Sequence, residues 1–262
     1  MEFWNEPCSL RPQDGFPAEG ETPFEAWLRS LTRAFDRLAS EFTQVQVIGH
    51  SFGALGAVFL ALRRPEKVGQ LTLLAPALDL LSTQKNILKL AIQDFEESGE
   101  NSKANQLREL LIQSVRAMDA PMEKAAQIAL TDPRLMTHYF VSPAKLGEWA
   151  SYLGAPEAQM DVAAYFGVSK SLPSFEELCQ SARAQPLEAP RPGASSLASA
   201  ALELSIDVRA LFGANDPVVS GGFASSEVQI ETLRRVFPQA KIEVIESAGH
   251  FVHLEAPRAL FG

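Results

Sequence analysis

Apolar residues recur along the chain with the periods of helices and strands. Thr22–Glu25 joins a capping threonine, a proline at the first helical position and a glutamate that completes a capping box, so it predicts a helix start. Apolar side chains then recur at helical spacing up to Leu38. The β-branched run Val45–Ile48 predicts a short strand that is buried on both faces.

The next segments complete a strand–helix–strand unit. Apolar positions after Ser51 follow a helical period, and Pro65 ends that helix. Leu71–Leu74 is a second run typical of a buried strand. This spacing predicts a parallel sheet with a crossover helix.

The pattern changes between residues 77 and 205, where strand-like runs disappear. Helices are predicted over residues 84–97, 103–118 and 174–184, with further first turns at Pro133, Pro143 and Pro156. The helix over 103–118 places Leu107, Leu110, Leu111, Val115 and Met118 on one face. A linker rich in Pro, Ala and Ser follows over 186–196.

Strand patterns return after residue 205. Val208–Phe212 and Lys241–Ile245 are predicted strands, Glu227–Phe237 is a predicted helix, and Pro257 starts a last helix. We therefore expect an α/β fold with a mostly parallel sheet flanked by helices. Its core comprises residues 1–76 and 206–262, and residues 77–205 form a helical cap.

Composition excludes several classes of function. The chain has 262 residues, 46% of them hydrophobic, as in globular proteins. Its net charge of −9 opposes nonspecific binding to nucleic acid or anionic membranes. Two distant cysteines, Cys8 and Cys179, and the lack of a signal peptide or membrane span favour a cytoplasmic protein. No Cys/His cluster has metal-site spacing, so we expect no metal or cofactor.

The segment Gly49–Gly53 carries the pattern G-x-S-x-G directly after the first strand. A serine on such a strand-to-helix turn sits in strained backbone, and the glycines two before and two after it must be small. The turn exposes the hydroxyl and aims helix N–H groups at the atom it attacks. Ser51 is therefore the candidate nucleophile, and a glycine-rich helix start is the alternative interpretation.

A serine nucleophile needs a base, and the base needs a partner that fixes its tautomer. Active sites of parallel sheets form at the carboxyl ends of the strands. Asp216 follows the strand that ends at Phe212, and His250 follows the strand that ends at Ile245. We therefore predict His250 as the base and Asp216 as the acid.

Other residues compete for these roles. His253 is the alternative base, although it lies further from the strand end than His250. Asp79 is the alternative acid, because it follows the strand Leu71–Leu74 at the same edge. On the residues alone, Asp216 also fits a turn or helix cap. His50 adjoins the nucleophile but points away from it on the turn, so no catalytic role is assigned to it.

Four stretches of the chain resemble the α/β-hydrolase superfamily, in the subgroup with a helical cap after the sixth core strand. They are Gly49–Ala54, Arg64–Pro76, Leu211–Pro217 and Ala248–Pro257. The chain order serine, aspartate, histidine is also the order of the triad in that family. The resemblance implies Ser51 as nucleophile, Asp216 as acid and His250 as base. It also implies the backbone N–H of Phe52 as an oxyanion donor.

The resemblance further concerns the N-terminus. Members of this family usually carry a His-Gly turn after the third core strand, whose backbone gives a second oxyanion donor, and residues 1–51 contain no such turn. Glu2-Phe3-Trp4 looks like the segment that follows it. We therefore expect the first strands of the core to be reduced or missing.

These observations favour a serine hydrolase that cleaves a carboxylic ester or thioester through an acyl-enzyme. The large apolar cap indicates a largely apolar acyl group, on a small molecule or an acyl carrier. Similar branches of the superfamily are carboxylesterases and the pimeloyl-carrier-protein methyl esterase. The alternatives are a carbon–carbon bond hydrolase and a fold relative that binds a small ligand with little or no turnover. The acyl chain, the leaving group and the oligomeric state stay open.

Overall fold

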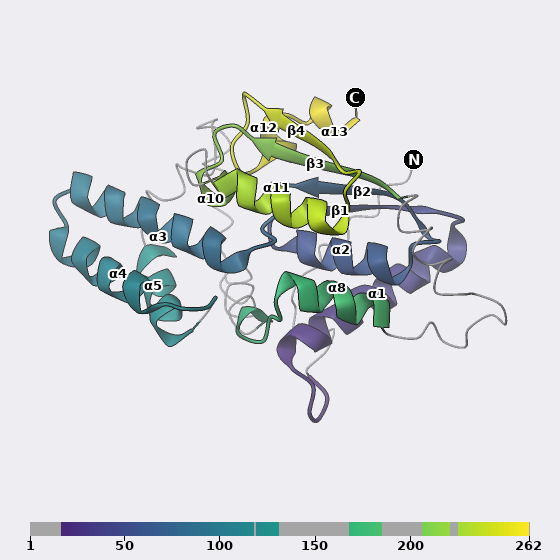
Figure 1. Cartoon of the computed structure of the whole chain (residues 1–262), viewed down its shortest axis with the longest axis horizontal. Coiled ribbons are helices and arrows are strands. Elements are labelled where there is room, and N and C mark those ends of the chain that lie inside the picture. The colour runs from purple at the N-terminus through teal and green to yellow at the C-terminus, as the bar shows by residue number, and fades with distance from the viewer. Residues whose placement is uncertain (1–16, 118, 131–167, 185–205, 221–224, 262) are drawn as a thin grey trace.

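A computed structural model describes residues 17–117, 119–130, 168–184, 206–220 and 225–261 (Figure 1). The helices are α1 (Pro23–Glu41), α2 (Gly53–Arg63), α3 (Leu80–Glu97), α4 (Asn101–Gln113), α5 (Ala120–Leu130), α8 (Phe175–Ala184), α10 (Pro217–Ser220), α11 (Ser225–Val236), α12 (Val252–Glu255) and α13 (Arg258–Phe261). The strands are β1 (Val45–His50), β2 (Val68–Leu74), β3 (Asp207–Gly213) and β4 (Lys241–Ile245). The predicted helix starts at Pro133, Pro143 and Pro156, the linker 186–196 and the predictions for the N-terminal strands lie outside the described residues.

The four described strands form one sheet in the order β1-β2-β3-β4, and every neighbouring pair is parallel. The prediction of a parallel sheet is therefore confirmed. Gly49 of β1 is in register with Leu73 of β2, and Gly213 of β3 is in register with Ile245 of β4. Because the strands are parallel, their carboxyl ends meet at one edge of the sheet.

One face of the sheet is covered by α1, α2, α8 and α11 (Figure 1). Alternate strand residues point into this layer, among them Val47, Leu71, Leu73, Ala210 and Phe212. Helix α2 is the centre of the layer, because all of its residues from Ala54 to Leu62 are buried. We call this side the main-core face.

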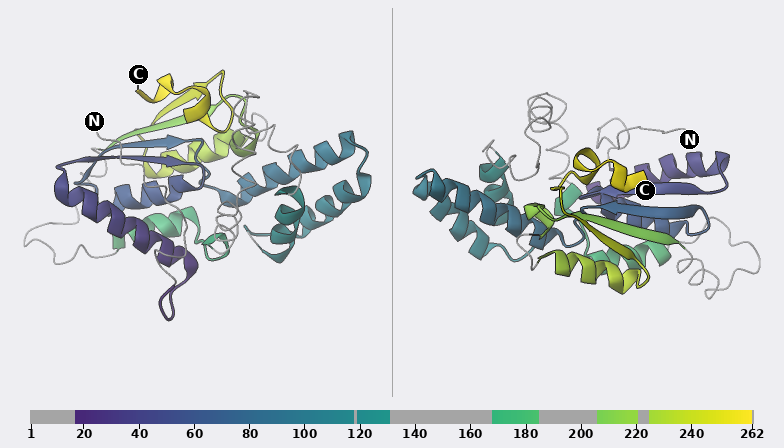
Figure 2. Two further views of the ribbon diagram at one scale, coloured as in Figure 1. Left: turned by 180° about the vertical axis from the view of Figure 1, so that it is seen from behind. Right: turned by 90° about the horizontal axis from the view of Figure 1, so that it is seen from above.

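The opposite face carries α12 and α13 (Figure 2). Near the carboxyl ends of the strands it holds a small apolar cluster of Leu74, Leu211, Ala248 and Val252, and we call this side the small-cluster face. Toward the amino ends its strand residues are polar, with ion pairs Arg209–Glu243 and Lys241–Asp207. Ile48 of β1 is 54% exposed, so the prediction that this strand is buried on both faces is wrong.

Helix α1 begins as predicted. The Thr22 side chain accepts a hydrogen bond from the Glu25 N–H, and the Glu25 carboxylate accepts one from the Thr22 N–H at 2.8 Å. Helix α1 then packs closely on α2, because a Cβ at Gly56 would lie 2.6 Å from Leu31 Cδ1.

The segment predicted as a cap contains two differently placed parts. Helices α3, α4 and α5 pack around a second apolar cluster, which includes Leu88, Phe95, Leu107 and Met122. Helix α8 instead packs on α2 and contributes Phe175, Leu178 and Ala182 to the main core. The division into a core and a cap at residues 77–205 stays a prediction.

Several boundaries differ from the predictions for reasons of capping. Helix α3 begins at Leu80 rather than at residue 84, because the Asp79 carboxylate accepts the Ser82 N–H at 3.0 Å. The helix predicted over 103–118 ends at Gln113, and Val115 is 80% exposed rather than packed. Helix α5 was not predicted from the sequence, and Asp119 caps it by accepting the Met122 N–H at 3.0 Å.

Gln229 of α11 forms hydrogen bonds with the segment that joins β2 to α3. The fully buried Gln229 side chain accepts hydrogen bonds from the Leu78 N–H at 2.8 Å and the Asp79 N–H at 2.9 Å. These bonds satisfy buried backbone donors where the chain leaves β2. None of the described helices combines the length and apolar character needed to cross a bilayer.

Candidate active site

Ser51 lies on the turn between β1 and α2 with a φ of 52°. Positive φ is strained for a non-glycine residue and costs about 1–3 kcal/mol, so the surrounding structure must hold it. The Ser51 N–H donates to the Leu74 carbonyl at 2.9 Å, and the Ser51 carbonyl accepts from the Ala77 N–H at 3.2 Å. The predicted strain is therefore confirmed, and the end of β2 together with the loop after it stabilises the turn.

The two glycines of the pattern differ in their surroundings. A Cβ at Gly49 would lie 2.7 Å from Ala57 Cβ and 2.8 Å from Ala54 Cα, so α2 can pack on the strand end only if this residue is glycine. A Cβ at Gly53 would meet no atom within 4 Å. The steric prediction is confirmed for Gly49 and wrong for Gly53, whose Cβ position faces open space.

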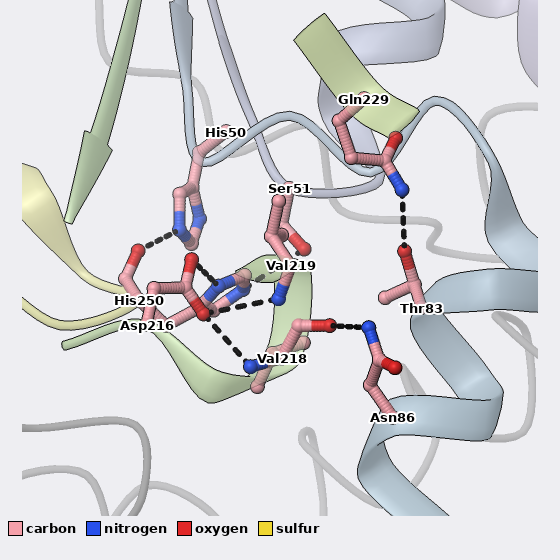
Figure 3. Close-up of polar contacts among 9 residues, drawn as sticks. All are labelled: His50, Ser51, Thr83, Asn86, Asp216, Val218, Val219, Gln229 and His250. Atoms are coloured by element: carbon pink, nitrogen blue, oxygen red, sulfur yellow. Dashed lines mark hydrogen bonds and ion pairs between the residues drawn. The ribbon is translucent and has the colours of Figure 1, made fainter. Parts of the chain in front are cut away.

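The structure brings Ser51, His250 and Asp216 together in one chain of hydrogen bonds (Figure 3). His250 Nε2 lies 3.0 Å from Ser51 Oγ, and His250 Nδ1 lies 3.0 Å from Asp216 Oδ2. His250 and Asp216 are 4% and 1% exposed, so the contact between them is shielded from water, whereas the contact with Ser51 is partly buried. When Nδ1 carries the proton and donates it to the carboxylate, Nε2 is left to accept the serine proton.

The second oxygen of Asp216 is also bound. Asp216 Oδ1 accepts hydrogen bonds from the Val218 N–H at 2.9 Å and the Val219 N–H at 3.1 Å. Asp216 thus caps the short helix α10 with one oxygen and contacts His250 with the other. The helix-cap interpretation and the acid interpretation of this residue are compatible, because each uses a different oxygen.

Sequence reasoning missed two residues that place His250. A Cβ at Gly213 would lie 2.1 Å from the Gly249 carbonyl oxygen, so the loop before His250 crosses directly over the end of β3. Asn215 donates its backbone N–H to the Ala248 carbonyl and its Nδ2 to the Glu246 carbonyl, both at 3.0 Å. The available signal was the Gly-Ala-Asn-Asp run after a strand, in which only the aspartate was read for function.

The competing candidates have other partners. The Asp79 carboxylate caps α3 by accepting the N–H and the hydroxyl of Ser82. The His253 ring packs edge-on against His50 at 4.9 Å between centroids, and its buried Nδ1 has no hydrogen-bond partner among the described residues. The geometry therefore favours Asp216 and His250 over both alternatives.

The His50 ring points toward the backbone of His250 (Figure 3). Its Nε2 is 3.0 Å from the His250 carbonyl oxygen. Burial, together with the neighbouring His250 and His253 imidazoles, holds the pKa of His50 well below its ordinary value. Burial is also the main cause that lowers the pKa of His253, and His250 adds to it. Both rings are thus kept neutral at neutral pH.

Phe52 follows the nucleophile and occupies the N-cap position of α2. Its ring lies 5.2 Å from the Trp27 ring of α1, so α1 helps to fix the residue after Ser51. Backbone N–H groups at a helix N-terminus point outward and favour negative charge. The role of the Phe52 N–H stays a prediction, and Glu2-Phe3-Trp4 lies outside the described residues.

Within the part of the chain that the structure describes, no group of three or more His, Cys, Asp or Glu side chains is arranged to hold a metal ion.

Comparisons with known proteins bear on the fold. A family model described as the alpha/beta hydrolase family matches residues 11–262. Among solved structures, the 2-hydroxy-6-oxo-6-phenylhexa-2,4-dienoate hydrolase of Rhodococcus sp. strain RHA1 is similar, with 14% identity over 91% of this chain and 69% of that chain, at a TM-score of 0.50. VinJ (13% identity, 93% and 72% covered, TM-score 0.46) and a thermophilic esterase (17% identity, 89% and 69% covered, TM-score 0.44) are also similar. At its low identity, the first likeness concerns the fold alone. The search of curated proteins found no match.

Proposed function

Because the chain belongs to the alpha/beta hydrolase family, we propose that it is a serine hydrolase that cleaves a carboxylic ester or thioester through an acyl-enzyme. The predicted fold class is confirmed by the same family match. The observation that supports the proposed activity is the hydrogen-bond chain from Ser51 through His250 to Asp216. It joins three loops at the carboxyl edge of a parallel sheet, where active sites form.

In the proposed first step, Ser51 Oγ attacks the acyl carbon of the substrate. His250 Nε2 accepts the hydroxyl proton, which makes the weakly nucleophilic serine reactive. His250 then carries a positive charge, and the Asp216 carboxylate stabilises it across the 3.0 Å contact. The two backbone N–H groups bound to Asp216 Oδ1 keep the carboxylate aimed at the imidazole.

The tetrahedral intermediate carries a negative charge on the former carbonyl oxygen. We assign the backbone N–H of Phe52 as one donor to this oxygen, because Phe52 directly follows the nucleophile at the start of α2. His250 then gives its proton to the leaving alcohol or thiol. It next takes a proton from the water that attacks the acyl-enzyme and gives it to Ser51 Oγ as the carboxylic acid is released.

The substrate is proposed to carry a largely apolar acyl group, on a small molecule or an acyl carrier. Helix α3 leaves the sheet from the carboxyl end of β2, the edge that also carries Ser51. This origin supports the proposal that the helical insertion encloses the acyl group and keeps water from it.

Hydrolysis of p-nitrophenyl acyl esters of increasing chain length tests the proposal. We expect turnover that rises with acyl length, covalent labelling of Ser51 by a fluorophosphonate probe, and a loss of at least about 10⁴-fold in kcat for Ser51→Ala. Ser40→Ala is the matched control, because Ser40 is exposed on α1 and its hydroxyl bonds only within that helix. Ser40→Ala is expected to match the wild type.

Paired variants test the assignment of the acid and the base. His250→Ala is expected to abolish turnover, whereas His253→Ala retains it. Asp216→Asn is expected to cost about 10³- to 10⁴-fold in kcat, whereas Asp79→Asn lowers mainly the melting temperature. Folded wild-type protein that neither turns over esters and thioesters nor takes the probe would contradict the proposal and favour a ligand-binding relative. Cleavage of a carbon–carbon bond in preference to esters would favour the alternative of a carbon–carbon bond hydrolase.

A further inference from the structure

His250 lies on an irregular loop between β4 and α12 rather than on a helix or strand. A base on such a loop needs restraints on its backbone as well as on its ring, because a misplacement of about 1 Å can cost 100-fold in rate. The ring contacts Ser51 and Asp216. The His250 carbonyl oxygen contacts the ring of His50 at 3.0 Å.

His50 is the last residue of β1 and the direct neighbour of the nucleophile. In the sheet it is in register with Leu74, whose side chain belongs to the small-cluster face. Its ring packs 4.9 Å from the His250 ring and 5.1 Å from the Phe251 ring, measured between centroids. The side chain of His50 thus contacts the backbone of His250, and the side chain of His250 contacts the side chain of Ser51.

We propose that His50 is a positioning residue, whose Nε2–H donates to the His250 carbonyl and thereby fixes the base relative to Ser51. The inference rests on the proposed serine-hydrolase function. We call the segment between β4 and α12, which carries His250, the base loop. Because His50 and Ser51 are consecutive, any movement of the base loop relative to Ser51 must break this hydrogen bond or distort the strained turn at Ser51. Asp216 fixes the ring of the base, and His50 fixes its backbone.

The protonation state of His50 suits this role. The titratable groups that face its ring are His250 and His253, and burial together with these two rings keeps His50 neutral. A neutral imidazole has one N–H, and the contact with a carbonyl oxygen assigns that hydrogen to Nε2. A neutral His50 also places no positive charge beside the imidazolium that forms on His250.

Two variants separate the hydrogen bond from ring packing. His50→Gln keeps an N–H donor and loses the ring, whereas His50→Phe keeps a ring and loses the donor. We expect His50→Phe to lower kcat for a p-nitrophenyl ester about 10-fold with little change in KM, and His50→Gln to stay within about threefold of the wild type. The rate of fluorophosphonate labelling at Ser51 should follow kcat, because both require the positioned base.

His253→Phe is the matched control, because His253 belongs to the same ring cluster but has no bond to the His250 carbonyl. It should match the wild type in kcat. Retention of kcat in His50→Phe, loss in His50→Gln alone, or a parallel loss of kcat and melting temperature in both would overturn the inference and assign His50 to packing. A wild type without hydrolytic activity refutes the proposed function instead, so the two failures are distinguishable.

Discussion

The two faces of the sheet differ in how much apolar structure they bury. The main-core face packs against α1, α2, α8 and α11, and its cluster includes residues from every one of these helices. Among the described residues, the buried cluster on the small-cluster face is limited to Leu74, Leu211, Ala248 and Val252, with Ile245, Ala256 and Leu260 packed against it. Since buried apolar area dominates stability, the described residues of the main-core face contribute more to the stability of the fold than those of the small-cluster face.

The base loop nevertheless packs on the small-cluster face, which buries less apolar structure. Ala248 and Val252 stand on either side of His250 in sequence, and both belong to the small cluster. His50 projects to the same side, whereas Gly49 faces α2. Stability and active-site geometry thus depend on different faces of the sheet, so substitutions on the two faces should affect different measurements.

The largest effect is expected for Gly213→Ala, at the close crossing of β3 and the base loop. The new Cβ would lie 2.1 Å from the Gly249 oxygen and 2.5 Å from the Ala248 oxygen, which are backbone atoms with nowhere to move except with the loop. We expect kcat/KM for an ester substrate to fall about 100-fold or more.

Gly69→Ala is the control for this prediction, because its nearest contact is the flexible Gln44 side chain at 3.0 Å. It should keep near wild-type kcat/KM. Wild-type activity in Gly213→Ala would show that the base loop is not fixed by this crossing.

Two consecutive leucines of β2 give the most direct comparison of the faces. Leu73 is fully buried in the main core, and Leu74 is 2% exposed in the small cluster. Each substitution to alanine should lower the free energy of unfolding by about 2–5 kcal/mol. Only Leu74→Ala should also lower kcat of the folded enzyme, by about 10-fold, because it leaves a cavity under the base loop.

Denaturant unfolding and kcat at a temperature where both variants are folded measure these two effects separately. An equal loss of kcat in Leu73→Ala would mean that the active-site geometry depends on both faces alike.

A smaller effect is expected from pH. The partly buried His50 and His253 have lowered pKa values in the folded state, against an ordinary value of 6.5. As the pH falls below that value, the unfolded chain binds protons that the folded chain does not, so stability is complete above it and decreases below it. The melting temperature should therefore fall more between about pH 7.5 and about pH 5.5 in the wild type than in His50→Phe/His253→Phe. An identical pH dependence would contradict the burial of these rings.

Much of the fold could be predicted from local patterns. The capping box at Thr22 and Glu25 and the strand Lys241–Ile245 are found where the sequence places them. The predictions are wrong where contacts between residues distant in sequence determine the structure. Ile48 was read as buried from its β-branched side chain, but whether a strand face is covered depends on elements distant in sequence. Helix α5 was not predicted, although it begins with an aspartate cap at Asp119 and a proline in its first turn, Pro121.

The candidate site shows the same limit. Strand ends and residue types were enough to predict that Ser51, Asp216 and His250 meet. They did not predict the crossing at Gly213, because a glycine at a strand end carries no sign of the backbone that passes over it. The hydrogen bond from His50 was missed because its partner is a carbonyl group, which every residue has.

The smallest effect is expected at the glycine after the nucleophile. Gly53 is the first residue of α2, and a Cβ there would meet open space. Gly53→Ala should raise stability by about 0.4–1 kcal/mol, because alanine loses less backbone entropy on folding. The esterase rate should stay near that of the wild type.

Gly49→Ala is the matched opposite of this substitution, on the main-core side of the same turn. Its Cβ would lie 2.7 Å from Ala57 Cβ, so α2 must move away from β1, at a cost of about 1–3 kcal/mol. Because α2 starts directly after Ser51 and Phe52, the esterase rate should fall with stability. Melting curves and p-nitrophenyl ester rates of the two variants measure the contrast. If Gly53→Ala loses as much activity as Gly49→Ala, the second glycine serves the space above Ser51 that a substrate occupies, rather than the packing of helix on strand.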